Sequence, residues 1–456
     1  MPRKLQIIVL FQNLGEAKPW YAKSPAPPLP GLLLAALTPP MVEVEVLHEM
    51  VRPVDYRTDA DLIALSFMDY CAPHAFEVAA RFRALGKTVI AGGKYPTSNP
   101  DEVQPHVDCV VVGEAEHVWP QVVEDYVAGR LATRYEAPHA PPLDGMPPPR
   151  YDLAESVFSV PVVTEATRGC PYACSFCQLT AVRTPFRTRP IADVVRDLSA
   201  TARLPWSKRR FAMLYDNNMG GDLAYAKELL RAVAKVNLLA WGAQFSFDCL
   251  HDGEFVELLA RSKCRMAFIG MESLNDQSLA HVHKTHNHVT EYRELFARLR
   301  RAGILTFAGL MFGLEADTPE YFTELRAQLD RLGPEILLMS IAIPIPGTPW
   351  HRELAAQGRI VDTDLSHYEG DHLVFRPSRV SPRELLAAYS AINRQFYGWG
   401  RVFRRWRRFL AAQPGFGLLP SSFLGTAITT AFYVQLTAFQ KHHAARRVWS
   451  CEEGGG

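Results

Sequence analysis

The chain has little of what would place it in a specialised class of protein. Its 49 Lys and Arg residues nearly balance 48 Asp and Glu residues, which excludes a global electrostatic preference for nucleic acid. Eight cysteines in 456 residues are too few for a disulfide scaffold. The short apolar run at residues 5–11 has no small-residue cleavage site after it, so we expect a first strand and a cytoplasmic protein.

What is present is an ordinary globular composition, with 48% hydrophobic and 21% charged residues and length for two to four domains. Residues 1–136 alternate short Val/Ile/Leu runs with helical patterns, as in a parallel sheet that is buried on both faces. Strands are expected at 5–11, 42–47, 61–68, 88–91 and 107–112, and helices at 29–37, 75–85 and 118–128. The pattern predicts a doubly wound, Rossmann-like α/β domain that binds ligands beyond the carboxyl ends of its strands.

A proline-rich stretch, residues 137–150, is the predicted linker because it can continue neither a helix nor a central strand. Over residues 151–355 longer strand and helix units follow. Strands are expected at 160–165, 211–215, 241–247, 266–271, 306–312 and 336–343, and helices at 192–202, 224–236, 253–262, 292–302 and 319–332. This alternation predicts a partial TIM-type (β/α)6 barrel with its active site where the strands end.

Residues 356–456 form a mainly helical carboxyl-terminal region in this prediction. Its notable feature is a basic, aromatic segment followed by a run without charges up to Gln440. Five arginines lie in this segment: Arg401, Arg404, Arg405, Arg407 and Arg408. Pro414 and Pro420 argue against a spanning helix. An interfacial helix, a lid over an apolar substrate, and a helix packed on the barrel all remain open.

The strongest chemical signal is three cysteines within eight residues, Cys170, Cys174 and Cys177, at the end of the first barrel strand. Three thiolates on so tight a loop suit a 4Fe-4S cluster with one iron left without a protein ligand. Zinc would need a fourth Cys or His in a second pair, and none lies nearby in the sequence. The other five cysteines are isolated and are expected to be buried small hydrophobes or exposed bystanders.

This Cys-x3-Cys-x2-Cys pattern after the strand that opens a barrel resembles the radical S-adenosylmethionine (SAM) superfamily. The resemblance implies that the open iron chelates SAM and that one-electron reduction cleaves it to a 5′-deoxyadenosyl radical. It also implies contacts to SAM from the aromatic residue before the third cysteine and from the strand ends. These residues are Phe176, Asp216, Asn217, Gln244, Ser246 and Glu272. Carboxylates at strand ends can accept hydrogen bonds from an ammonium or a sugar hydroxyl, although each alone could equally be a helix cap or a surface charge.

A doubly wound domain before such a barrel resembles the cobalamin-binding domain of one subgroup of the superfamily. The resemblance assigns cobalamin contacts to residues that follow the third, fourth and fifth strands: Ser66, Gly92, Gly93, Gly113 and Glu114. The family's Asp-x-His-x-x-Gly motif is missing, and the loop after the first strand reads Gln12-Asn13-Leu14-Gly15. Either cobalamin is bound without a histidine ligand or the domain is only a scaffold. A nicotinamide site is excluded because no Gly-x-Gly-x-x-Gly turn follows the first strand.

The leading hypothesis is therefore a cobalamin-dependent radical SAM enzyme that methylates an unactivated carbon. No catalytic residue is assigned beyond the cofactor contacts. The competing hypotheses are radical oxidation, cyclisation or rearrangement without methyl transfer, and a non-catalytic iron-sulfur protein. The arginine-rich segment favours an amphiphilic small-molecule substrate, such as an isoprenoid lipid or a tetrapyrrole, and peripheral membrane contact; peptide and antibiotic-type substrates stay open. An electron donor such as flavodoxin or ferredoxin is expected, and no nucleic acid.

Overall fold

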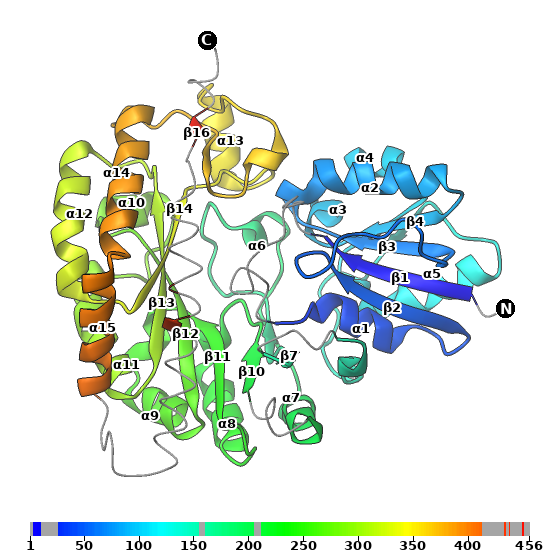
Figure 1. Ribbon diagram of the computed structural model, residues 1–456, viewed down its shortest axis with the longest axis horizontal. Coiled ribbons are helices and arrows are strands. Elements are labelled where there is room, and N and C mark those ends of the chain that lie inside the picture. Colours follow the sequence, from blue (N-terminus) through cyan, green and yellow to red (C-terminus); the bar gives the residue numbers. More distant parts are fainter. Residues whose placement is uncertain are drawn as a thin grey trace.

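The computed structural model describes residues 3–10, 26–154, 160–204, 211–412, 433–434, 437 and 449–450. It contains two six-stranded, all-parallel sheets built from successive parts of the chain, and these lie side by side (Figure 1). The predicted α/β class, with a doubly wound domain followed by a partial barrel, is confirmed.

The first sheet has the strand order β2-β1-β3-β4-β5-β6. Its strands are β1 (Arg3–Val9), β2 (Val42–His48), β3 (Leu62–Ser66), β4 (Thr88–Gly92), β5 (Cys109–Val112) and β6 (Arg134–Glu136). The helices around it are α1 (Leu29–Leu37), α2 (Ala72–Ala84), α3 (Lys94–Ser98), α4 (Pro100–Val103) and α5 (Trp119–Val127). Neighbouring side chains of β1 enter different cores: Ile7 packs with residues of α1 and α5, and Ile8 packs with residues of α2. Helices therefore cover both faces of the first sheet, as the apolar runs predict. The sequence did not predict β6, which is only three residues long and polar.

Residues 137–150 contain no helix or strand. The second sheet follows them, with the order β14-β13-β12-β11-β10-β7. Its strands are β7 (Val162–Thr164), β10 (Phe211–Leu214), β11 (Ala240–Phe245), β12 (Cys264–Glu272), β13 (Leu305–Phe312) and β14 (Ile336–Ile341). The helices that alternate with them are α7 (Ile191–Ser199), α8 (Leu223–Val233), α9 (Gly253–Arg261), α10 (Asp276–His281), α11 (Tyr292–Arg301) and α12 (Pro319–Leu332). Because β7 and β14 are not paired, the barrel is open.

The barrel helices begin at short polar side chains that follow the strand ends. Asp222 accepts from the Tyr225 amide at the start of α8, and Asp252 accepts from the Phe255 amide at the start of α9. Such caps satisfy amides that lack a partner in the first turn of a helix. Strand ends and helix starts are therefore both fixed at this edge of the barrel, where the site lies.

The helices that follow β14 are α13 (Pro349–Ala356), which ends where the predicted carboxyl-terminal region begins, and then α14 (Pro382–Phe396) and α15 (Trp399–Ala411) within that region. Arg405 of α15 is buried, and it donates to the carbonyl oxygens of Glu335 (3.1 Å) and Phe396 (2.9 Å). Glu335 directly precedes β14, so α15 packs at the amino-terminal edge of the barrel, away from the strand ends that carry the cysteine loop.

The packed-helix alternative is thus confirmed for α15, and the lid alternative is wrong for it. Most of the uncharged run after α15 lies outside the described residues. None of the helices in the described part of the chain has the length and apolar character needed to cross a membrane.

Candidate functional site

The cysteine loop, residues 170–177, leaves the barrel at the carboxyl end of β7. A two-residue strand, β8 (Thr167–Arg168), precedes it and pairs with β9 (Arg187–Thr188), and α6 (Gln178–Ala181) follows it. Between β8 and the first cysteine, Gly169 has φ = +85°, and a Cβ there would lie 2.1 Å from the carbonyl oxygen of Pro185. Only glycine can make this approach, so the backbone itself fixes where the loop begins.

Backbone hydrogen bonds hold the middle of the cysteine loop. The Ser175 amide donates to the Val282 carbonyl after α10, and the Ser175 carbonyl accepts from the Trp350 amide at the start of α13, each at 3.0 Å. The ring of Tyr172 stacks on His286, with 3.6 Å between the ring centroids. Two parts of the chain, the segment 282–286 after α10 and the start of α13, therefore support the loop.

The three thiols have the donor chemistry of a cluster site. Cys174 is buried, and Cys170 and Cys177 are half-buried. Burial raises the pKa of Cys170, and raises that of Cys174 to about 11. The amide of Asn218 donates to the Cys170 sulfur at 3.9 Å, and the Lys284 ammonium lowers the pKa of both thiols. A thiolate ligand needs such compensation because burial disfavours its charge.

Among the described residues, no group of three or more His, Cys, Asp or Glu side chains could hold a single metal ion. This is compatible with a cubane cluster, because each thiolate would bind a different iron and the three sulfurs need not converge on one point. Three cysteines on one loop therefore fit a 4Fe-4S cluster with one iron open to a further ligand.

Glu272 ends β12 beside this loop in an unusual backbone conformation. Its φ is +63°, and the register between β12 and β13 shifts between Gly270 and Glu272. A Cβ on Gly270 would lie 2.3 Å from Glu272 Oε1, so only glycine leaves room for the carboxylate. Asn287 donates from Nδ2 to the Gly270 carbonyl at 2.9 Å and holds the irregularity in place. Non-glycine residues in this conformation concentrate at functional sites.

Lys284 is the partner of Glu272, with 3.4 Å between Nζ and Oε1. Burial raises the pKa of Glu272, while Lys284 lowers it. Burial alone would lower the pKa of Lys284, but Glu272 and Cys174 raise it above the usual value, so the side chain remains an ammonium. Sequence reasoning did not assign Lys284 or Asn218 to the site. Asn218 could have been predicted as a site residue, because it directly follows the predicted Asp216 and Asn217.

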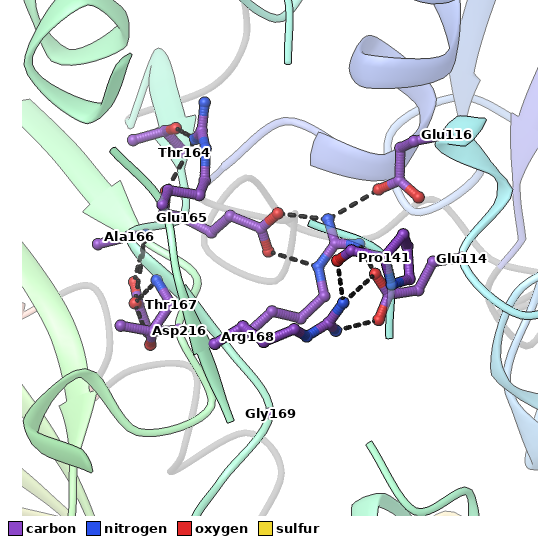
Figure 2. Close-up of polar contacts among 12 residues, drawn as sticks. Glu114, Glu116, Pro141, Thr164, Glu165, Ala166, Thr167, Arg168, Gly169 and Asp216 are labelled. Carbon is purple, nitrogen blue, oxygen red and sulfur yellow. Dashed lines mark hydrogen bonds and ion pairs between the residues drawn. The ribbon is translucent and has the colours of Figure 1, made fainter. Parts of the chain in front are cut away.

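Two of the residues predicted to contact SAM, Asp216 and Asn217, accept hydrogen bonds from other residues of the chain. Asp216 accepts from the amides of Ala166 and Thr167 and from the Thr167 hydroxyl (Figure 2). Burial raises the pKa of Asp216 to about 7. Asn217 accepts from the Gly169 amide at 3.1 Å. Both side chains therefore hold the backbone that enters the cysteine loop.

The other predicted SAM contacts have more varied surroundings. Gln244 is exposed, whereas its neighbours on β11 are buried. The Ser246 hydroxyl donates to Asn218 Oδ1 at 3.1 Å. Phe176 is half-buried and packs against the barrel core. Ser246 thus lies at a strand end near the cysteines, and Phe176 lies in the cysteine loop itself. The side-chain amide of Gln244 is exposed.

In the first domain, Ser66 and Gly92 are paired at the carboxyl ends of β3 and β4. Gly93 has φ = +105°, and a Cβ there would lie 2.9 Å from the Phe67 carbonyl oxygen. Gly113 has φ = +89°, and its amide donates to Thr97 Oγ1 at 3.0 Å. These residues line one edge of the sheet with little side chain, as a site for a bulky ligand requires.

Glu114 does not share these surroundings, because its carboxylate contacts Arg168 and Arg187 of the barrel (Figure 2). The loop Gln12-Asn13-Leu14-Gly15 lies outside the described residues.

Comparison with known proteins agrees with this geometry. Residues 164–329 match the model of the radical SAM superfamily. The chain is 30% identical over 388 residues to bacteriochlorophyllide d C-12(1)-methyltransferase of Chlorobaculum tepidum, covering 83% of this chain and 84% of that protein. It is 28% identical over 393 residues to the C-8(2)-methyltransferase of the same organism, covering 82% and 86%.

A solved structure has the same fold. The radical SAM methyltransferase TsrM from Kitasatospora setae, with cobalamin and a [4Fe-4S] cluster bound, superposes with a TM-score of 0.61 at 18% identity. The superposition covers 98% of this chain and 100% of that one. The arrangement of a doubly wound domain beside an open barrel is therefore shared.

Proposed function

Because the chain belongs to the radical SAM superfamily, in the subgroup with a cobalamin-binding-type first domain, we propose that this enzyme is a cobalamin-dependent methyltransferase. The proposed reaction places a methyl group on an unactivated carbon of a tetrapyrrole-type substrate. The observation that carries the proposal is the position of the cysteine loop, between the strand ends of the barrel and the carboxyl edge of the first sheet.

The bound groups would supply the radical and the methyl carrier, and the chain's residues position them. Cys170, Cys174 and Cys177 would hold the cluster. Glu272 would accept from the SAM ammonium, and Gln244, Ser246 and Phe176 would line the rest of the SAM site. Asp216 and Asn217 would act as positioning residues, since their oxygens already bind the backbone before the loop.

Ser66, Gly92, Gly93 and Gly113 would face cobalamin in the first domain. The absence of side chains at three of these positions supports close approach of a large ligand to the backbone. The protein would also exclude water and oxygen from the space between the two domains, as radical chemistry requires.

The tetrapyrrole substrate class is supported by two relatives whose names give bacteriochlorophyllide d as their substrate. It also fits the amphiphilic substrate expected from the sequence. A flavodoxin- or ferredoxin-type protein is the proposed electron donor. Peripheral membrane contact is proposed through the outer face of α15, where Trp399 and Phe403 are 65% and 66% exposed; liposome cosedimentation tests it.

Anaerobic reconstitution with iron and sulfide tests the cluster assignment. The wild-type protein should show 4Fe-4S absorption and form 5′-deoxyadenosine from SAM when dithionite is added. Cys174→Ala should lose both. Cys264→Ala is the matched control, because this buried cysteine begins β12 at the opposite end of the barrel strand. Retention of both signals in Cys174→Ala would refute the cluster assignment.

A titration with hydroxocobalamin tests methyl transfer. Binding should change the corrin spectrum, and the reduced, cobalamin-loaded protein should convert SAM to S-adenosylhomocysteine. Formation of 5′-deoxyadenosine alone, with an unchanged corrin spectrum, would instead support radical chemistry without methyl transfer. If SAM is not cleaved at all, the protein would be a non-catalytic iron-sulfur protein.

A further inference from the structure

The cysteine loop is bordered on both sides by contacts that cross to the first domain. Before the loop, Arg168 donates from Nη1 to Glu114 at 2.6 Å and from Nη2 to Glu116 at 2.7 Å (Figure 2). The same guanidinium pairs with Glu165 of its own domain. These side chains are between 12% and 21% exposed, so water screens the charges weakly.

A second arginine, Arg187, also pairs with the Glu114 carboxylate. Arg187 lies opposite Arg168 in the β8–β9 pair. It contacts Glu114, and it donates to the Pro141 carbonyl in the linker at 2.5 Å. The positive φ of Gly113 turns the chain just before this carboxylate. Glu114 is thus fully engaged in joining the domains.

After the loop, the residue that follows Cys177 makes the second crossing. Gln178 donates from Nε2 to Asp69 Oδ2 at 2.6 Å, and both side chains are buried. Asp69 lies three residues beyond the end of β3. Burial raises its pKa, while Gln178 lowers it. A buried hydrogen bond of this kind is costly to leave unmade.

The two crossings bracket one position on the first sheet. Asp69 follows β3, and Glu114 and Glu116 follow β5. In the sheet, β4 lies between these strands and ends at Gly92. Arg168 precedes Cys170 by two residues, and Gln178 follows Cys177 by one. The cysteine loop is therefore joined to the first domain at both ends. The two attachment points lie on either side of β4, the strand that ends at Gly92 and is followed by Gly93.

We propose that Arg168 and Gln178 are positioning residues that clamp the cluster loop to the carboxyl edge of the first sheet. The clamp sets the distance between the SAM bound at the cluster and the cofactor bound at Gly92 and Gly93. Glu114 and Asp69 serve as its anchors on the first domain and do not contact the cofactor. This inference rests on the proposed methyltransferase function, and it goes further by assigning residues to the coupling of the two cofactor sites.

The test compares two products of SAM in the same reduced, hydroxocobalamin-loaded protein. Methyl transfer from the sulfonium leaves S-adenosylhomocysteine, whereas one-electron cleavage leaves methionine and 5′-deoxyadenosine. Loosening the clamp should slow methyl transfer across the domain interface more strongly than it slows one-electron cleavage of SAM at the cluster. In Arg168→Met and Gln178→Leu, the ratio of S-adenosylhomocysteine to 5′-deoxyadenosine should fall about tenfold. In Arg168→Lys, which keeps the charge but not the forked geometry, the fall should be smaller.

Matched controls separate this effect from general destabilisation. Arg150→Met removes a linker arginine that pairs only with the nearby, exposed Asp152, and Gln357→Leu removes an exposed glutamine of the carboxyl-terminal region. Both should keep the wild-type ratio. Iron content, hydroxocobalamin affinity and the thermal unfolding midpoint are measured for each variant. Hydrogen exchange at residues 113–117 should increase in Arg168→Met and not in Arg150→Met.

The outcomes distinguish the two proposals. Wild-type protein that binds hydroxocobalamin but forms no S-adenosylhomocysteine would refute the proposed methyl transfer, whatever the variants do. Wild-type protein that forms both products, with an unchanged ratio in Gln178→Leu and Arg168→Lys at normal iron content, would overturn the clamp. Gln178→Leu removes an uncharged side chain and leaves the pairs of Arg168 with Glu114 and Glu116 intact, so it tests the clamp even if Arg168→Met does not fold.

Discussion

The ammonium nitrogen of Lys284 lies 3.4 Å from Oε1 of Glu272, and the two side chains, near the cysteine loop, are only 10% and 13% exposed. The two residues are separated by α10 in the sequence and meet only because the chain returns to the end of β12. The pair holds the Lys284 ammonium close enough to the Cys170 and Cys174 thiols to lower the pKa of both.

Lys284→Met should make the cluster harder to reduce. A cluster held by three thiolates is negatively charged and gains a further negative charge on reduction, which the nearby ammonium stabilises. We expect the ratio of reduced to oxidised cluster at a fixed potential to fall about tenfold, equivalent to about 59 mV for one electron. A redox titration followed by electron paramagnetic resonance measures it. Lys227→Met, on the outer helix α8, should leave the potential unchanged; an equal shift in both variants would contradict the prediction.

Gly93→Ala should damage the first domain and its ligand site. At φ = +105° an alanine is strained, and its Cβ would lie 2.9 Å from the Phe67 carbonyl oxygen. We expect a loss of about 1–3 kcal/mol in the free energy of unfolding and weaker hydroxocobalamin binding. Urea denaturation and a corrin titration measure these effects. Gly129→Ala is the control for backbone strain alone, since it also has a positive φ but open space around it. Equal hydroxocobalamin affinity in the two variants would argue against a ligand site at Gly93.

Asp317→Asn should change how stability depends on pH. Burial raises the pKa of Asp317 to about 7, while the Gly313 and Leu314 amides lower it. The folded protein therefore keeps this proton to higher pH than the unfolded chain, whose aspartate titrates near 4. Unfolding releases the proton between these values, so the free energy of unfolding falls as pH rises from about 4 to about 7.

The asparagine variant should lack this part of the pH dependence and be more stable than the wild type near pH 7. Its amide oxygen can still accept from both backbone amides that Asp317 Oδ2 now binds, at 2.8 and 3.1 Å. Denaturation curves at pH 5 and pH 7.5 measure the difference. If the variant and the wild type have the same slope, Asp317 is charged in the folded protein.

Arg405→Met should destabilise the barrel by about 2–4 kcal/mol, because it removes two hydrogen bonds to buried carbonyls and a cation–π contact with Phe396. Thermal unfolding measures it. Arg404→Met, at an exposed position of the same helix, should change stability by less than about 0.5 kcal/mol. Similar losses in both variants would show that the helix contributes through its charge and not through the packing of Arg405.

Local patterns in the sequence were enough to predict several features. The apolar runs predicted eleven of the twelve parallel strands of the two sheets to within a few residues, because buried parallel strands need a nearly continuous apolar face. The three cysteines proposed as cluster ligands were identifiable because they lie within one loop. The adjacent glycines Gly92 and Gly93 of the first domain are likewise a short-range feature.

Other assignments depended on partners that are distant in the sequence. The resemblance assigns Glu114 a cobalamin contact, and the structure adds what the sequence did not predict, a pairing of its carboxylate with Arg168, 54 residues away. Gln178 and Asp69 are 109 residues apart, and only the fold brings the Lys284 ammonium to the Glu272 carboxylate.

The sequence by itself therefore determined most of the parallel strands, the α/β architecture and the cysteine loop proposed to hold the cluster, since these follow from periodicity and from close spacing. The tertiary structure alone decided which charged groups pair beside the cysteine loop and which join the two domains. The physical reason is that a side chain's role depends on the charges and donors within a few ångströms of it, and folding brings those together from parts of the chain that share no local pattern.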